Sequence, residues 1–173
     1  EVDSITLTAG KHTIIAVDAP QGNLQLKVHG RSDYKSLQCI VRKSGESQTL
    51  NIQDFNKTIK YLVGKYDLEV LSLPRTLIND VEISQSHTTT VEIPQPGIAS
   101  ILMVSRGYGS IFVEEDNQLK LIYNLKETTR ETLVLQPGRY RIVFRSRGSK
   151  ESIYTMEKSF KITSGSSTQV KLY

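Results

Sequence analysis

The sequence repeats one stretch of thirteen residues, and this repeat decides the fold. One copy is Val81-Glu-Ile-Ser-Gln-Ser-His-Thr-Thr-Thr-Val-Glu-Ile93, and another is Phe160-Lys-Ile-Thr-Ser-Gly-Ser-Ser-Thr-Gln-Val-Lys-Leu172. A fainter copy covers residues 5–17. A second motif, Gly64-Lys-Tyr-Asp-Leu-Glu-Val70, returns 74 residues later as Gly138-Arg-Tyr-Arg-Ile-Val-Phe144. Because two motifs recur in the same order at nearly the same spacing, the chain is predicted to contain tandem copies of a unit of roughly 75 residues.

Apolar and polar residues alternate strictly within these motifs, as in Tyr66-Asp-Leu-Glu-Val70. Such alternation predicts strands with one buried face. Gly, Pro, Ser and Asn separate many short alternating runs at intervals of about 8 to 12 residues, which is typical of a β-sandwich. Short connections favour antiparallel pairing. We therefore predict an all-β chain of two tandem antiparallel β-sandwich domains related by an internal repeat.

The best internal boundary is Pro94-Gln-Pro-Gly97, because prolines remove backbone donors and end a strand. It predicts a first sandwich over residues 1–96 and a second over residues 97–173. Residues 1–19 are predicted to form a hairpin with its tip at Ala9-Gly10, equivalent to the closing hairpin of each later unit. This hairpin either caps the first domain or belongs to a missing predecessor. Since the chain opens Glu1-Val-Asp3 on the end of a repeat unit, we expect it to be part of a longer protein.

Charge is distributed unevenly along the chain. The formal net charge is +4. Residues 1–93 carry 10 basic and 11 acidic side chains, whereas residues 94–173 carry 12 and 7, so only the second unit is basic. The single cysteine, Cys39, excludes an intramolecular disulfide, and its place in an alternating apolar run predicts an inert core thiol. No stretch approaches the roughly 20 apolar residues of a membrane-spanning helix, and no run of residues has the pattern expected of a signal peptide.

The two units share the cadence Leu135-Gln-Pro-Gly-Arg-Tyr140 and Leu62-Val-Gly-Lys-Tyr66. It resembles the transthyretin-like and carboxypeptidase-regulatory-like sandwich families, in which it leads into a core strand. The whole tandem resembles the C-terminal portion of bacterial secreted proteins that carry a von Willebrand factor A domain ahead of such repeats. This resemblance implies a secreted, periplasmic or cell-surface location. The metal signature of the A domain, Asp-x-Ser-x-Ser, is absent here, so no metal-binding role carries over.

Motifs for catalysis are missing from the sequence. It has no Gly-x-Ser-x-Gly elbow, no His-Glu-x-x-His pair and no Walker loop, and we expect no enzymatic activity, cofactor or metal. His12 and His87 fall near the tips of equivalent hairpins and are read as exposed turn residues. Glu114-Glu-Asp-Asn117 lacks the alternate spacing of a Ca²⁺ loop and is read as a hairpin tip. Asn56-Lys-Thr58 is a formal glycosylation sequon.

One feature distinguishes the second unit chemically. Alternate residues of a strand share a face, so Tyr140, Ile142 and Phe144 are predicted to face the core while arginines face outward. The candidate anion- or partner-binding face comprises Arg139, Arg141, Arg145, Arg147 and Lys150. The alternative is a solvated outer face whose basic residues discourage edge aggregation. Nucleic acid is not expected, because Tyr140 and Phe144 point away from the basic residues.

Three hypotheses of function follow. The leading one is a non-catalytic structural or interaction module, a spacer, assembly or adhesion segment of a larger secreted or surface bacterial protein whose partner is a protein or a polysaccharide. The second is a carbohydrate- or anion-binding module that uses the basic face, or loops at Tyr34 and Tyr108. The third is an accessory domain of an enzyme whose catalytic part lies elsewhere in the parent chain.

Overall fold

The computed structural model describes residues 6, 8–12, 14, 18–31, 34–148 and 155–173. Within these residues the chain forms fourteen β-strands and no helix. The strands of the first unit are β1 (Gln21–Val28), β2 (Gln38–Lys43), β3 (Thr49–Asp54), β4 (Thr58–Leu62), β5 (Gly64–Val70), β6 (Thr76–Ile83) and β7 (Thr88–Ile93). Those of the second unit are β8 (Gly97–Met103), β9 (Gly107–Glu115), β10 (Gln118–Asn124), β11 (Arg130–Leu135), β12 (Gly138–Ser146), β13 (Thr155–Ile162) and β14 (Ser167–Leu172).

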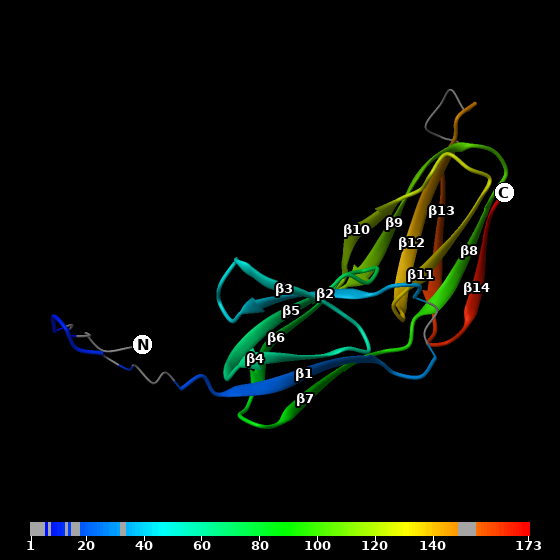
Figure 1. Ribbon diagram of the computed structural model, residues 1–173. Helices are drawn as coiled ribbons and strands as arrows, with labels where there is room; N and C mark the ends of the chain where they lie inside the picture. Colours follow the sequence, from blue (N-terminus) through cyan, green and yellow to red (C-terminus); the bar gives the residue numbers. More distant parts are fainter. Residues whose placement is uncertain (1–5, 7, 13, 15–17, 32–33, 149–154) are drawn as a thin grey trace.

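Each unit folds into two sheets with the same strand order. The first unit pairs β4-β1-β7 in one sheet and β3-β2-β5-β6 in the other, and the second unit pairs β11-β8-β14 and β10-β9-β12-β13. Figure 1 shows the two sandwiches following one another at a bend, with β1 to β7 in one and β8 to β14 in the other. The prediction of an all-β chain with two tandem sandwiches is therefore confirmed.

Two details differ from the predicted antiparallel pattern. The first strand of each unit pairs in parallel with the last, with Leu26 opposite Val91 and Ile101 opposite Val170. The stretch read as a closing hairpin is not one, because β6 pairs with β5 while β7 belongs to the opposite sheet. The turn between them instead carries the chain across the sandwich, so that both apolar arms of the repeat face the core from opposite sheets.

The predicted hairpin over residues 1–19 falls largely outside the described residues. Its expected tip is described, and there the amide of Lys11 donates to the carbonyl of Thr8 at 3.2 Å, with Gly10 at a φ of 75°. Within the fainter repeat copy over residues 5–17, positions 5, 7, 13 and 15–17 are not described.

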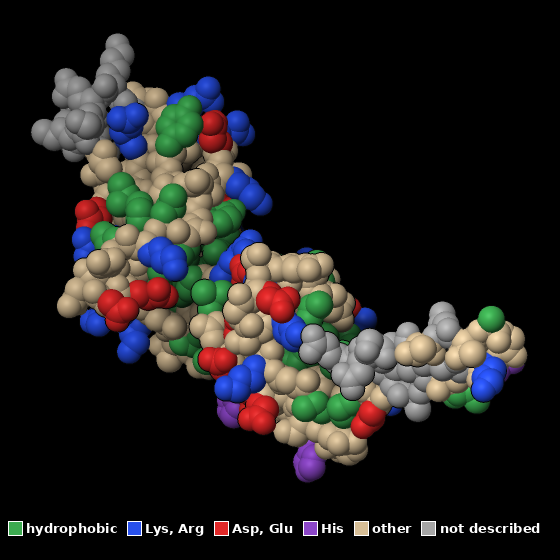
Figure 2. Space-filling model, turned by 90° about the vertical axis from the view of Figure 1, so that its left-hand side faces the viewer, with side chains coloured by type: hydrophobic (Ala, Val, Ile, Leu, Met, Phe, Trp, Pro, Cys, Tyr) green, Lys and Arg blue, Asp and Glu red, His purple; other side chains and the backbone are tan. Residues whose placement is uncertain are grey.

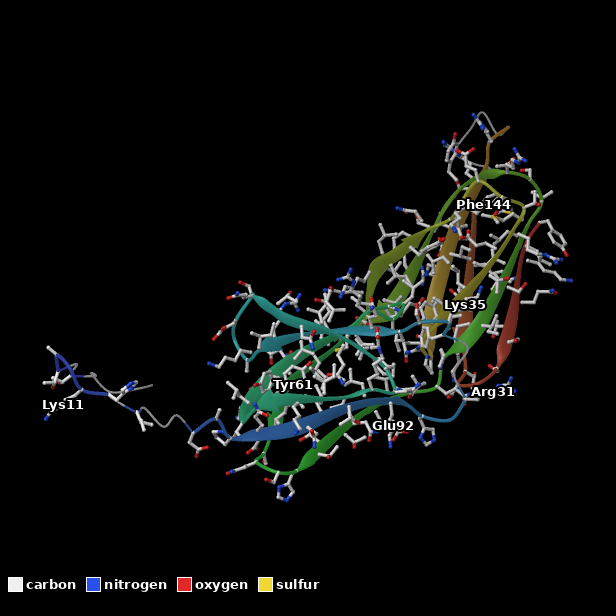
Figure 3. The ribbon with its side chains drawn as sticks, viewed as in Figure 1. Lys11, Arg31, Lys35, Tyr61, Glu92 and Phe144 are labelled. Atoms are coloured by element: carbon white, nitrogen blue, oxygen red, sulfur yellow. The ribbon has the colours of Figure 1, made fainter. Side chains whose placement is uncertain are left out.

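Two separate cores fill the sandwiches. In the second unit Tyr140, Ile142 and Phe144 are fully buried on β12, as their alternation predicted, and Figure 3 shows Phe144 inside this sandwich. The corresponding residues of β5 are Tyr66, Leu68 and Val70, which are buried in the first core. The first strands approach the opposite sheet so closely that only glycine fits: a Cβ at Gly97 would lie 2.7 Å from the carbonyl oxygen of Thr163.

The shared motif of Leu, Gly and Tyr has a structural role where the chain crosses from one sheet to the other. The hydroxyl of Tyr66 donates to the carbonyl of Leu62 at 2.7 Å, and that of Tyr140 donates to the carbonyl of Gln136 at 2.5 Å. Each tyrosine therefore ties the end of one sheet to the beginning of the other, in the manner of a tyrosine corner.

Candidate functional site

The basic residues of the second unit lie along one strand and its extension. Arg139, Arg141 and Arg145 occupy the outer face of β12, which is central in its sheet, and Arg147 follows the end of that strand. Arg139, Arg145 and Arg147 are exposed. Six residues separate Arg139 from Arg145, so the row extends about 20 Å along the sheet. Lys150, the last residue of the predicted face, lies outside the described residues.

Neighbouring strands supply carboxylates to part of this row. Arg141 contacts Glu114 on β9 at 3.1 Å and Glu157 on β13 at 2.8 Å, and its bond to Glu114 is the largest cause that raises the pKa of the guanidinium. Arg147 pairs with Glu127 at 3.0 Å. Arg139 and Arg145, in contrast, form no ion pair with any carboxylate that the structure describes. They are the cations of the row that remain available to a ligand.

The same face also carries apolar side chains, of which only Tyr108 was a candidate from the sequence. Tyr108 and Phe112 alternate with buried residues on β9 and therefore share the outer face with the arginines, while Leu119 and Leu121 extend the apolar area along the edge strand β10. Tyr108, Leu119 and Leu121 are each about half exposed. The alternation of polar and apolar residues along β9 would have been sufficient to predict that Tyr108 and Phe112 share the outer face. A shallow hollow at its end is lined by Leu119, Arg139 and residues of the β9–β10 turn.

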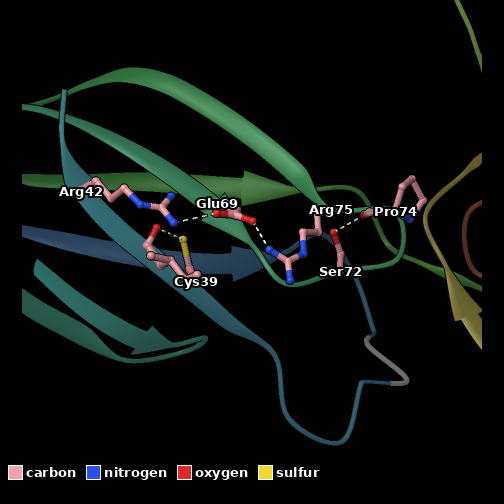
Figure 4. A network of polar contacts seen from close by, with 7 residues as sticks. Cys39, Arg42, Glu69, Ser72, Pro74 and Arg75 are labelled. Carbon is pink, nitrogen blue, oxygen red and sulfur yellow. Dashed lines mark hydrogen bonds and ion pairs between the residues drawn. The ribbon is translucent and has the colours of Figure 1, made fainter. Parts of the chain in front are cut away.

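The equivalent face of the first unit has the opposite charge arrangement. Here a carboxylate, Glu69 on β5, is flanked by Arg42 on β2 at 2.9 Å and by Arg75, with which it also forms an ion pair. Figure 4 shows Glu69 between the two guanidiniums, with Ser72 and Pro74 on the far side of Arg75. These bonds, first that from Arg75, hold the pKa of Glu69 below its ordinary value. The charges of Glu69, Arg42 and Arg75 on this face are therefore paired with one another.

The two units meet at a joint that we define as the segment Leu71–Arg75 of the first unit and the β11–β12 corner of the second. The carbonyl of Leu73 accepts from the amide of Gln136 at 2.8 Å, and its side chain packs against the second core. The side-chain amide of Gln136 donates to the hydroxyl of Tyr34 at 2.9 Å. Burial raises the pKa of Tyr34. Tyr34 is thus a joint residue and not the exposed loop residue of the carbohydrate hypothesis.

A cleft of about 350 Å³ opens beside the joint. It is lined by Glu69, Leu73 and Leu77 from the first unit and by Lys120 and Leu121 from the second, among others. Its lining mixes acidic, basic and apolar side chains, without a convergent set of polar groups. Tyr108, the other tyrosine of the carbohydrate hypothesis, lies at the opposite end of β9 from Glu115, which also borders this cleft.

The remaining predicted positions behave as simple structural residues. Cys39 is a free, fully buried thiol, as predicted, and burial is the main cause that raises its pKa to about 12. His12 and His87 are exposed. Asp116 and Asn117 form the tip between β9 and β10 with φ values of 49° and 60°, which confirms the predicted hairpin tip. Asn56 is exposed in the turn between β3 and β4.

Figure 2 shows basic, acidic and apolar side chains intermixed over the visible face of both sandwiches. Among the described residues, no group of three or more His, Cys, Asp or Glu side chains is arranged to hold a metal ion. Within the same residues there is also no helix long and apolar enough to cross a membrane.

No family model matches the sequence, and no curated protein is similar to it. Solved structures show distant likeness. The minor pilin GBS52 of Streptococcus agalactiae is 9% identical with a TM-score of 0.42, and the match covers 87% of this chain and 94% of that one. The TIE protein of Bacillus anthracis is 15% identical with a TM-score of 0.35, over 88% of this chain and 33% of that one. A streptococcal ancillary pilin is 16% identical with a TM-score of 0.34, over 91% and 64%. The chain thus spans about a third of the length of the TIE protein.

Proposed function

We propose that the chain is a non-catalytic structural and interaction module, a two-sandwich spacer of a larger secreted or surface protein. The observation that carries this proposal is the joint. A spacer must hold its two ends at a fixed distance and orientation. Its domains must therefore not rotate freely relative to each other. Linked domains are expected to move relative to each other unless their interface is large and apolar or otherwise fixed.

Three contacts at the joint oppose such motion. The side chain of Leu73 packs against the second core, its carbonyl accepts a backbone hydrogen bond, and Gln136 adds a side-chain bond to Tyr34. Gln136 is only 7% exposed, so these bonds are shielded from competition by water. The short linker Pro94-Gln95-Pro96 limits rotation further, because proline fixes φ.

Residual dipolar couplings on the full chain test this proposal. A rigid spacer aligns both sandwiches with a single tensor. Leu73→Asp places an unpaired carboxylate against the second core and should give two tensors of different magnitude, each sandwich staying folded. The matched control is Ile52→Asp, since Ile52 is an apolar residue of the same unit that is 53% exposed on β3 and does not line the cleft beside the joint. Independent tensors in the unmodified chain would refute the spacer function.

A second function is favoured by one observation: Arg139 and Arg145 are exposed and form no ion pair with a carboxylate of the described residues. We propose that Arg139 and Arg145, with Arg147 after the end of the strand, form a binding face for an anionic polysaccharide or an acidic protein surface. The half-exposed Tyr108 lies opposite Arg145 in the pairing of β9 with β12 and offers a ring for stacking.

Heparin chromatography separates this face from general charge attraction. The Arg139→Glu and Arg145→Glu double variant should lose retention at moderate salt. The control is Arg130→Glu with Lys171→Glu, which makes the same change of charge at exposed positions of the other sheet. Equal retention of both variants would remove the binding face. No feature of the structure favours the hypothesis of an enzyme accessory domain.

A further inference from the structure

The two units can be aligned residue by residue at the corner where the chain passes between sheets. Tyr66 and Tyr140 make the same corner bond, so Leu62 and Val63 correspond to Gln136 and Pro137. These two pairs of residues therefore occupy equivalent places in the two sandwiches.

A third equivalent position lies on the neighbouring edge strand. The register of β3 with β2 shifts between Val41 and Arg42, which leaves Leu50 as the extra residue. The register of β10 with β9 shifts in the same way and leaves Ile122 as the extra residue. Leu50 and Ile122 are therefore equivalent bulged residues.

In the second unit this corner is covered by the first unit. Gln136 is 7% exposed, and its amide is bonded to Leu73. Ile122 is partly buried, packs against the same core as Leu73 and lines the cleft that Leu73 borders. The corner of the second unit is thus the receiving half of the joint.

In the first unit the same corner is more exposed and more apolar. Leu62 is 55% exposed, Val63 43% and Leu50 51%. In the second unit, Ile122 and Gln136, the equivalents of Leu50 and Leu62, both lie beside Leu73. Solvent exposure alone would favour polar side chains here, yet the covered corner has the glutamine and the open corner has leucine and valine. This reversal indicates that the open corner is adapted to burial.

We propose that the corner formed by Leu50, Leu62 and Val63 receives a further sandwich of the same repeat, through a segment equivalent to Leu71–Arg75. The occupant reaches the corner from the N-terminal side of β1, since the amide of Val63 donates to the carbonyl of Pro20, where the chain enters that strand. This inference rests on the proposed spacer function and names its partner: another unit, docked by the joint already present between the two described sandwiches.

A chain with an internal duplication tests the inference. Residues 22–96 are repeated in tandem within the full chain, so that the added unit runs through its own Pro94–Pro96 linker into Gly22, the equivalent of Gly97. Leu73→Cys in the added unit and Leu62→Cys in the next unit should then form a disulfide under mild oxidation. Lys60→Cys, on the same strand but exposed away from the corner position, is the matched negative control and should not crosslink.

The unmodified joint provides the positive control. Leu73→Cys with Gln136→Cys in the original chain should crosslink, because a backbone hydrogen bond joins these two residues. Failure of this control, together with independent alignment tensors for the two sandwiches of the unmodified chain, refutes the joint and with it the spacer function. Success of the control without a Leu73–Leu62 crosslink overturns only the inference.

Two other occupants are distinguished by separate measurements. A crosslink between Ile14→Cys and Leu62→Cys in the original chain would show that the chain's own N-terminal segment covers the corner. Concentration-dependent self-association of the original chain, abolished by Val63→Asp, would show that a second copy covers it. Either result overturns the inference. If the cysteine variants fail to fold, small-angle X-ray scattering of the duplicated chain without cysteine substitutions tests the inference instead. A third unit that moves freely relative to the other two would contradict docking.

Discussion

Removal of a single hydroxyl at the corner of the second unit should destabilise that unit more than the same change in the first. Tyr140 is fully buried, and its hydroxyl donates to the carbonyl of Gln136, a residue that the joint shields from water. Burial is the largest cause that raises the pKa of Tyr140. Tyr140→Phe leaves the carbonyl without this partner, and an unsatisfied buried polar group costs about 1–3 kcal/mol.

The matched variant is Tyr66→Phe. Tyr66 is 4% exposed and makes the same bond, but its acceptor belongs to Leu62, which is 55% exposed. Water can replace the hydroxyl there, so we expect a cost of about 1 kcal/mol for Tyr66→Phe and about 2 kcal/mol for Tyr140→Phe. For a domain of this size, 2 kcal/mol corresponds to a fall in Tm of roughly 10 °C.

Urea unfolding followed by circular dichroism, with calorimetry to resolve the two units, measures both costs. The reasoning fails if Tyr140→Phe proves no more destabilising than Tyr66→Phe, or if it costs less than about 0.5 kcal/mol. The first result would mean that the joint does not exclude water from the corner. The second would mean that the corner bond does not stabilise the crossing between the sheets.

Three further outcomes are expected. Gly97→Ala should destabilise the second unit by about 1–3 kcal/mol in urea unfolding, because its Cβ meets a backbone oxygen, whereas Gly148→Ala, with nothing within 4 Å, should be neutral. Burial, and after it Glu131, raises the pKa of Tyr123 to about 12. The neutral hydroxyl therefore contributes fully to stability below pH 10, and this contribution is lost as the pH rises through 12. In thermal unfolding measured at a series of pH values, the Tm of Tyr123→Phe should fall less steeply above pH 10 than the Tm of the unmodified chain. Cys39 should resist aromatic disulfide reagents in the native chain and react at once in denaturant, and rapid native labelling would contradict its burial.

Local alternation was sufficient to predict the strands and the direction of their side chains. The inward set on β12 follows from a period of two, as does the outward placement of Arg139 and Arg145. The parallel pairing of β1 with β7 could not be predicted in this way. It joins residues such as Leu26 and Val91, which are far apart in sequence, and a parallel register leaves no mark on the local pattern.

The carboxylates that form ion pairs with the basic row could not be predicted from the sequence either. Glu114 and Glu157 belong to two different neighbouring strands and meet Arg141 only because β12 is central in its sheet. The joint could not be predicted from the sequence, because Ser72-Leu73-Pro74 is typical of an ordinary turn. A leucine in a turn becomes significant only when the surface that it contacts is known.

The divergence between the units at their equivalent corners argues that the order of units is fixed. Interchangeable repeats would present the same corner at every position, because each would meet the same neighbour. Here the covered corner holds Gln136, which uses its side chain to bond Tyr34 of the preceding unit, while the open corner holds Leu62, which has no such capacity. Whatever docks on Leu62 and Val63 must therefore present an apolar surface without requiring a hydrogen bond from that side chain. An added unit identical to the first satisfies the apolar condition through its own Leu73, but not the contact from Gln136 to Tyr34. The duplicated chain should accordingly dock more weakly than the native joint, and Leu62→Gln in its middle unit should strengthen the docking.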